Sequence, residues 1–338
     1  MLYIPFDDLV RTLEAALDKA GVDAPRAARL ADVFARNSLE GVYSHGVNRF
    51  PRFLFCIREG IVRLDTTPER VASLGGMEVW DGGFGPGPLI AEDAMARAIE
   101  LARTHGIACV SVRNSSHWMR AGRYGRQAAQ AGMAAILFTN TTANMPAWGA
   151  EDPRLGNNPI VLAVPRSKGP VVVDTAMSQF AYGKLEVAVQ NGQMLPFDGG
   201  YDEEGRLTRD PKAILKTRRI LPAGYWKGSA MSLALDLLAG ALSMGRTVCA
   251  VTRAPEDEAG LSQVFIAINF RGLLPAEQVD GLLDEAVEFL LSSKPVPGGA
   301  PIRYPGQDVE RTAARNMERG VPVAEETWEK IQAHMTRP

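Results

Sequence analysis

Hydrophobic residues recur at helical spacing through the first seventy residues of the chain. The pattern breaks at Ser44-His45-Gly46, which predicts a corner between two helices. Asn48 is the predicted cap of the next helix, because a short polar side chain can accept a hydrogen bond from a free backbone N–H there. The predicted helices of this region, residues 1–70, are 6–20, 25–43 and 48–60.

From about residue 70 onward, short apolar runs typical of strands alternate with longer helical segments. The segment 228–244 is apolar nearly all round, which predicts a helix buried on every side. Turn residues are dense in 196–205 and predict a surface excursion near 191–222. The predicted strands are 77–81, 107–112, 134–140, 160–165, 171–174, 248–252 and 263–269. The other predicted helices are 90–104, 119–131, 180–190 and 275–292.

This order of elements predicts an α/β protein in three parts. A helical domain, 1–70, carries the corner, and a mixed α/β domain follows over 71–299. A loop rich in proline and glycine then leads to a C-terminal helical segment, 300–338. We expect that last segment to pack with residues 1–70.

Composition sets limits on the class of protein. Hydrophobic residues make up 46% of the chain and charged residues 22%, which is ordinary for a globular protein. A net charge of -2 provides no basic field for nucleic acid, and the apolar stretches are too short to predict a membrane span. The start of the chain lacks the pattern of a secretory signal, so we expect a cytoplasmic protein. Cys56, Cys109 and Cys249 are predicted to be buried, reduced thiols.

His45 and Arg49 are the leading candidates for chemistry. An imidazole titrates near neutral pH and can pass a proton. A guanidinium is a permanent cation whose fork of N–H groups fits a carboxylate. The pair therefore suits an enzyme that protonates a carbonyl beside an acid group. His117 follows a predicted strand, where α/β proteins place ligand-binding groups, but a structural role stays equally open. His105 is expected to be structural, and His334 lies in the C-terminal tail.

Two further segments have competing interpretations. The glycines of 82–88 lack the spacing and the following acidic residue of a dinucleotide fingerprint, so a simple loop before a helix is favoured. Lys227 and Ser229 open the apolar helix, where free N–H groups favour an anion; a surface lysine and a capping serine are the alternative. The histidines and cysteines show no metal-ligand spacing, and we expect no metal.

Several of these segments, taken in order, are similar to the type-2 malate/L-lactate dehydrogenase family. The similarity runs over nearly the whole chain, and the ordered set is far more specific than any one member. The matching motifs are Tyr43-Ser44-His45-Gly46, His117, Gly156-Asn157-Asn158-Pro159, 174–178, Tyr182-Gly183, Lys227-Gly228 and 236–240.

The resemblance implies a mixed-sheet, non-Rossmann nicotinamide-binding domain flanked by a helical domain built from both termini. It also implies a cytoplasmic homodimer that uses NADH, with NADPH possible, and His45 as the proton donor. At Gln307 and Asp308 the chain departs from the family pattern, so the contacts expected there are those of the backbone. The cofactor-binding residues implied by the resemblance are Val172, Val173, Asp174, Thr175, Ala176, Met177, Ser178, Trp226, Lys227, Gly306, Gln307 and Asp308.

The hypothesis that follows is reduction of a 2-keto sugar acid by NADH. Arg49 would hold the substrate carboxylate, and His45, as imidazolium, would donate the proton. Ser44 would orient that ring, and His117 would add a hydrogen bond to substrate or nicotinamide. Within the family, a malate, lactate or ureidoglycolate dehydrogenase or a cyclic-imine carboxylate reductase is the alternative. From another class, the alternative is a non-catalytic ligand-binding protein.

Overall fold

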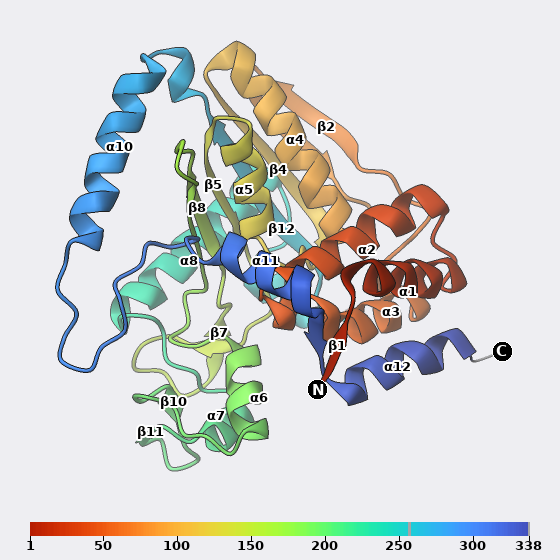
Figure 1. Cartoon of the computed structure of the whole chain (residues 1–338). Helices are drawn as coiled ribbons and strands as arrows, with labels where there is room; N and C mark the ends of the chain where they lie inside the picture. Colours follow the sequence, from red (N-terminus) through yellow and green to blue (C-terminus); the bar gives the residue numbers. More distant parts are fainter. Residues whose placement is uncertain (256–257, 337–338) are drawn as a thin grey trace.

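The computed structural model describes residues 1–255 and 258–336 and is built around one large sheet (Figure 1). Its seven strands lie in the order β2-β3-β4-β12-β5-β8-β9. β3 and β4 are parallel and the five other neighbouring pairs are antiparallel, which confirms the predicted mixed sheet. The strands are β2 (Glu69–Leu74), β3 (Met77–Asp81), β4 (Ile107–Ser116), β5 (Ala134–Thr139), β8 (Ile160–Val164), β9 (Val171–Thr175) and β12 (Ala259–Ile268).

The central strand, β12, is covered on both faces of the sheet. Because successive side chains of a strand point to opposite faces, its residues divide between two apolar cores. Phe265 and Ala267 pack with α4 and α5, whereas Val264 and Ile266 belong to the core that includes α8. These three helices are α4 (Gly87–His105), α5 (Gly122–Gln130) and α8 (Trp226–Ser243).

The N-terminal helices share a core with the C-terminal end of the chain (Figure 1). β1 (Leu2–Ile4) pairs antiparallel with β13 (Val321–Val323). Ile331 is fully buried in the same core as Leu9 and Leu13. The helices here are α1 (Phe6–Lys19), α2 (Ala24–Leu39), α3 (Phe50–Arg58), α11 (Val309–Arg319) and α12 (Glu325–Thr336).

The remaining elements are short, apart from α10, which runs along the outer side of the molecule (Figure 1). None of the residues of α10 is buried. The elements are β6 (Met145–Pro146), β7 (Pro153–Leu155), α6 (Tyr182–Gln190), β10 (Gly200–Tyr201), β11 (Leu207–Thr208), α7 (Pro211–Thr217), α9 (Val248–Arg253), a 3-10 turn (Phe270–Gly272) and α10 (Ala276–Leu291).

The strand predicted over 248–252 is wrong, because these residues form the helix α9. Val248 and Val251 are buried and the residues between them are exposed, which is helical spacing. The Val248 N–H donates to the Asp236 carboxylate at 2.8 Å, which satisfies one free donor of the first turn. Tertiary contacts thus override the preference of valine for strands. Cys249 is consequently exposed and Cys109 half-buried, so only Cys56 is buried as predicted.

The prediction that 228–244 is buried on every side is also wrong. α8 buries one face, including Leu235 and Ala239, against the sheet. Its opposite face carries large apolar side chains that are about half exposed, such as Leu233 at 49% and Leu237 at 56%. An exposed apolar face of this kind is uncommon in a monomeric protein.

The corner between α2 and α3 begins earlier than predicted. α2 ends at Leu39 rather than at residue 43, and Gly41 follows with φ of +87°, a conformation that favours glycine. Asn48 lies within a 3-10 turn and does not cap α3, which begins at Phe50; the predicted cap is therefore wrong.

Within the described ranges, none of the helices combines the length and the apolar character that crossing a bilayer requires.

Gly228, in the first turn of α8, is a position where we expect a side chain to destabilise the fold. A Cβ there would lie 2.4 Å from the Ala223 carbonyl oxygen and 2.8 Å from that of Met177, so the backbone would have to shift. We expect Gly228→Ala to lower the free energy of unfolding by about 1–3 kcal/mol in urea titrations. The matched change Gly281→Ala in α10, where nothing lies within 4 Å, should raise it by about 0.5–1 kcal/mol. Similar effects at both positions would contradict the argument.

Candidate active site

The corner that carries His45 is held against α2 by close packing. The Asn37 side-chain amide donates to the His45 carbonyl at 2.9 Å, and the Val47 N–H donates to the Ser38 hydroxyl at 2.7 Å. A Cβ on Gly46 would lie 2.1 Å from the same hydroxyl oxygen, so a larger residue does not fit without a shift. Packing therefore fixes where the His45 backbone lies.

Ser44 is beside the His45 ring, as the orienting role predicted for it requires. Its Oγ lies 3.0 Å from His45 Nδ1. A hydroxyl can donate to a neutral ring nitrogen or accept from a protonated one. The contact can therefore persist when His45 gains or loses a proton.

His117 stacks on His45 at the end of β4, so the structure brings the two predicted histidines together. Their ring centroids are 5.6 Å apart with an angle of 26° between the planes. The Met119 N–H donates to His117 Nδ1 at 2.9 Å. Because a backbone N–H can only donate, Nδ1 must be unprotonated and the neutral ring carries its hydrogen on Nε2. His117 is thus arranged as a hydrogen-bond donor.

Burial keeps both imidazoles neutral at physiological pH. Desolvation, with the positive charge of Arg49, lowers the pKa of His117 to about 3. Desolvation also lowers the pKa of His45 to about 3, helped by His117 and by the charges of Arg49 and Arg120. The negative charge of the Glu258 carboxylate opposes this shift by raising the pKa of His45. The imidazolium that the sequence hypothesis requires for proton transfer is therefore not the resting state of His45 in the free protein.

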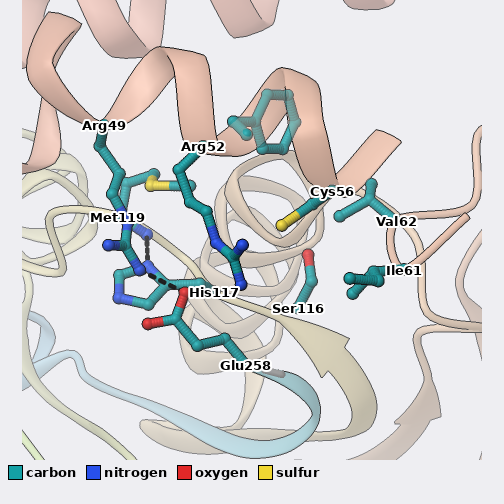
Figure 2. Close-up of a pocket in the computed structure, with 10 residues that line it drawn as sticks. Arg49, Arg52, Cys56, Ile61, Val62, Ser116, His117, Met119 and Glu258 are labelled. Carbon is teal, nitrogen blue, oxygen red and sulfur yellow. Dashed lines mark hydrogen bonds and ion pairs between the residues drawn. The ribbon is translucent and has the colours of Figure 1, made fainter. Parts of the chain in front are cut away.

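A narrow cavity lies beside His117 (Figure 2). Arg49 and Arg52 extend into it from the start of α3, and Glu258 enters from the segment before β12. The Arg49 guanidinium and the Glu258 carboxylate form an ion pair across it. Its free space is about 20 Å³, which holds about one water molecule. The other lining residues are Phe53, Cys56, Ile61, Val62, Ser116 and Met119.

A second cavity, of about 400 Å³, borders the same short segment of chain. His117 and Met119 line the first cavity, and Arg120 and Gly122 line the second, so the segment 117–122 contributes to the walls of both. The residues that line the second cavity are Arg120, Gly122, Arg126, Val172, Val173, Asp174, Pro305, Gly306 and Val309.

The second cavity combines two guanidinium groups with a carboxylate. Arg120 and Arg126 are each paired with a glutamate, Glu40 and Glu310 respectively. The Asp174 carboxylate, which solvent reaches through the cavity, accepts a hydrogen bond from the Gly122 N–H at 2.7 Å. Desolvation raises the pKa of Asp174, while that N–H and the charge of Arg120 oppose the shift.

The structure places four of the predicted cofactor residues in the wall of the second cavity: Val172, Val173, Asp174 and Gly306. Gly306 has φ of +91°, and a Cβ on it would approach the Val172 backbone to 3.4 Å, so the absence of a side chain keeps this part of the wall open.

The other predicted cofactor residues do not line either cavity. Thr175 is exposed and Ala176 half-buried after β9, whereas Met177 and Ser178 are buried, and the Ala223 N–H donates to the Met177 carbonyl at 2.8 Å. This contact brings the segment 174–178 close to the start of α8.

Trp226 and Lys227 are exposed at the start of α8. Ser229 accepts from the Trp148 N–H at 2.7 Å, and no side chain caps α8, so the capping alternative for Ser229 is wrong. The anion site expected at Lys227 stays a prediction.

Gln307 and Asp308 turn their side chains toward local partners. Gln307 Oε1 accepts from the Tyr304 N–H at 3.1 Å. Asp308 forms ion pairs with Arg303 and Arg311. Backbone contacts remain the expectation for both residues.

Three groups near the histidines were missed from the sequence. Arg52, in the first turn of α3, lies three residues after Arg49, which precedes that helix; this helical spacing puts both side chains on the same face and would have revealed Arg52. Glu258 and the Glu40 partner of Arg120 meet their arginines only through the tertiary fold, and no local pattern signals them. In the described part of the chain, no cluster of histidine, cysteine and acidic residues could hold a metal ion.

A family model described as malate/L-lactate dehydrogenase matches residues 4–332. The chain belongs to the malate/L-lactate dehydrogenase family. Its membership confirms the resemblance found in the sequence motifs and makes it an oxidoreductase by family.

Relatives of this malate/L-lactate dehydrogenase family member include two proteins named 2,3-diketo-L-gulonate reductase. That of Escherichia coli O6:K15:H31 (strain 536 / UPEC) is 46% identical to the chain, and that of Shigella boydii serotype 4 (strain Sb227) is 45% identical. Each alignment of 330 residues covers 98% of this chain and 99% of the relative.

Solved structures of family members share the fold. Malate dehydrogenase from Pyrococcus horikoshii OT3 has a TM-score of 0.90 at 28% identity, covering 100% of this chain and 96% of that one. Delta1-piperideine-2-carboxylate reductase from Pseudomonas syringae pvar. tomato has a TM-score of 0.86 at 26% identity, covering 99% and 100%. One architecture therefore serves several related substrates.

We expect the His45 and His117 rings to stay neutral from about pH 8 to about pH 5 in the free protein, because burial lowers both pKa values to about 3. Nitrogen-detected NMR of the imidazoles measures this directly, with His45→Gln and His117→Gln used for assignment. His117 should show the Nε2–H tautomer. A titration midpoint near the ordinary value of 6.5 for either ring would contradict the electrostatic argument.

Proposed function

We propose that this protein reduces a 2-keto sugar acid with NADH, and that 2,3-diketo-L-gulonate is the first substrate to test. The observation that carries the proposal is that His45 stacks on His117, which with Arg49 lines a cavity, and that the segment 117–122 also lines a second, larger cavity. The names of the relatives at 45–46% identity support this choice of substrate. NADPH is the alternative coenzyme.

Arg49 is the group that binds the substrate carboxylate in this proposal. Its guanidinium already holds a carboxylate, that of Glu258, inside the cavity. A bidentate pair between this guanidinium and a substrate carboxylate would fix both the distance and the plane of the acid group. The neighbouring keto carbon is then held at the His117 end of the cavity.

The proton comes from His45, which must first become charged. Because burial and nearby cations hold its pKa at about 3, the free ring is neutral at pH 7. A substrate carboxylate adds a negative charge beside the ring and favours the imidazolium. Ser44 can accept from Nδ1–H in that state and keep the ring oriented. Proton uptake is therefore coupled to substrate binding.

His117 polarises the keto oxygen without transferring its own proton. The Met119 N–H occupies Nδ1, so Nε2–H is the donor available to a substrate. A donor fixed in place stabilises negative charge as it develops on the oxygen. Two imidazoles in different protonation states thus divide the work between them.

The second cavity fits a nicotinamide dinucleotide. Arg120 and Arg126 provide positive charge for phosphates, Gly122 and Gly306 leave room for close backbone approach, and Asp174 can accept from a ribose hydroxyl. Bound there, the reduced coenzyme would supply the hydride. Residues of the segment 117–122, which line both cavities, would then contact both molecules, and the nicotinamide would have to reach the keto carbon directly for the hydride to transfer.

Other reactions of the family are the alternatives to this substrate. Malate, lactate and ureidoglycolate dehydrogenation and cyclic-imine reduction use the same groups. A non-catalytic binding protein is the alternative of another class. A cytoplasmic location stays an expectation of the family resemblance.

The decisive assay follows NADH absorbance with 2,3-diketo-L-gulonate, pyruvate, oxaloacetate and a cyclic imine carboxylate. We expect the sugar acid to give the highest kcat/KM. His45→Ala should lower kcat by about 10²–10⁴-fold while NADH binding, followed by fluorescence, is retained, because only the proton donor is removed. Unchanged turnover in the variant would remove His45 from the mechanism. If no acid caused NADH oxidation, the alternative of a non-catalytic binding protein would be favoured.

We also propose that the protein is a homodimer joined through the exposed apolar faces of α8 and α10. Both helices present large apolar side chains to solvent at helical spacing. A second copy of the chain would cover these side chains. The exposed residues are Met231, Leu233, Leu237, Leu238, Leu282, Phe289 and Leu290.

We expect light scattering after gel filtration to give twice the chain mass for the wild type. Leu237→Glu and Phe289→Glu should each shift the mass toward that of one chain, because a buried unpaired charge opposes association. Leu207→Glu, at an exposed leucine of β11, is the matched control and should leave the mass unchanged. A dimer that tolerates both changes would contradict the proposed interface.

A further inference from the structure

Among the described residues that line the narrow cavity beside His117, Glu258 is the one with an acidic side chain. It immediately precedes β12, where Ala259 pairs with Ser116, the residue before His117. Its φ of +57° is rare for a residue with a side chain. The sheet thus places an anionic side chain next to His117, pointing toward the guanidinium of Arg49 (Figure 2).

Glu258 and the substrate compete for the same guanidinium if the proposed function holds. The Arg49–Glu258 pair is about 30% exposed on each side, so solvent screens it only in part. A substrate carboxylate can share Arg49 with Glu258, because the guanidinium has five N–H donors. A second carboxylate on the substrate would bring a third negative charge, after Glu258 and the first carboxylate, into a cavity lined by two cations, Arg49 and Arg52.

We propose that Glu258 is a specificity-determining residue that disfavours substrates with a second carboxylate. Arg49 already holds the Glu258 carboxylate, so an acid group bound to the same guanidinium, and a second acid group next to it, lie within a few ångströms of Glu258. Like charges at such separations, in a site with little water, change an equilibrium by about ten-fold or more. The inference rests on the proposed function only in taking Arg49 as the acid-binding group.

The charge of Glu258 also bears on the proton donor. The Glu258 carboxylate counters the effect of the nearby cations on the pKa of His45. A singly charged acid can bind with this carboxylate still in place. A dicarboxylic acid favours movement of Glu258 away from the cavity, which removes that support from His45.

A merely structural role makes a different prediction. If Glu258 served only to hold Arg49 in position, its loss would weaken singly and doubly charged acids alike. If Glu258 instead selects by charge, its loss changes the ratio of the Kd of singly charged acids to the Kd of doubly charged acids. Two small ligands of nearly equal shape separate these cases: oxamate carries one negative charge and oxalate carries two.

The test is calorimetric titration of oxamate and oxalate into the full-length protein with NADH present, for the wild type, Glu258→Gln and Glu258→Asp. We expect Glu258→Gln to raise the ratio of the oxamate Kd to the oxalate Kd by about ten-fold, because glutamine keeps the shape and removes the charge. Glu258→Asp should keep the wild-type ratio. Glu326→Gln, which removes an equal charge from an exposed pair on α12, is the control for net charge and should also keep it.

An unchanged ratio in Glu258→Gln, equal weakening of both ligands, or no binding of either ligand to any variant would overturn the proposal. A second measurement compares kcat/KM for pyruvate and oxaloacetate in the wild type and in Glu258→Gln. The ratio of kcat/KM for oxaloacetate to that for pyruvate should be higher in the variant. Failure of the proposed function is seen separately, as no NADH oxidation with any acid, while the oxamate-to-oxalate ratio still reports on Glu258.

Discussion

The pairing of β4 with β12 determines where the groups of the candidate site lie. β4 ends at Ser116 and delivers His117, while β12 begins beside it and delivers Glu258. Because β12 is covered on both faces, neither strand end can shift without disturbing two apolar cores. The helical corner with His45 and Arg49 then packs against this fixed edge. The site is thus an interface between a rigid sheet and a helical layer.

Electrostatics at this interface explain why two histidines sit close together without repelling each other. Burial and nearby arginines keep both rings neutral, and the Met119 N–H assigns one of them a fixed tautomer. Only His45 has a partner, Ser44, that can follow a change in protonation. The geometry therefore distinguishes a fixed donor from a ring that can gain and lose its proton.

The sequence predicted the groups whose chemistry is local and missed those that depend on distant contacts. His45, Arg49 and His117 stand out because their residue types and their positions at a helix break and a strand end are visible in the chain. Glu258 meets Arg49 only through the fold, as an ion pair between residues 209 positions apart. The mixed sheet followed from the alternation of elements. The helix α9 could not be predicted from the sequence, because contacts from Asp236 outweigh the strand preference of its valines.

The pairing of β1 with β13 has a consequence for how the molecule is made. β1 leaves the ribosome long before β13 and cannot pair with it until residues 321–323 have been synthesised. The apolar core of the first helices also includes Val321, Val323 and Ile331. Part of that core therefore stays exposed to solvent until these residues have been synthesised. The central sheet can assemble earlier, since β12 is translated well before β13. Chains truncated near the C-terminus should therefore keep a folded sheet but lack a closed helical layer.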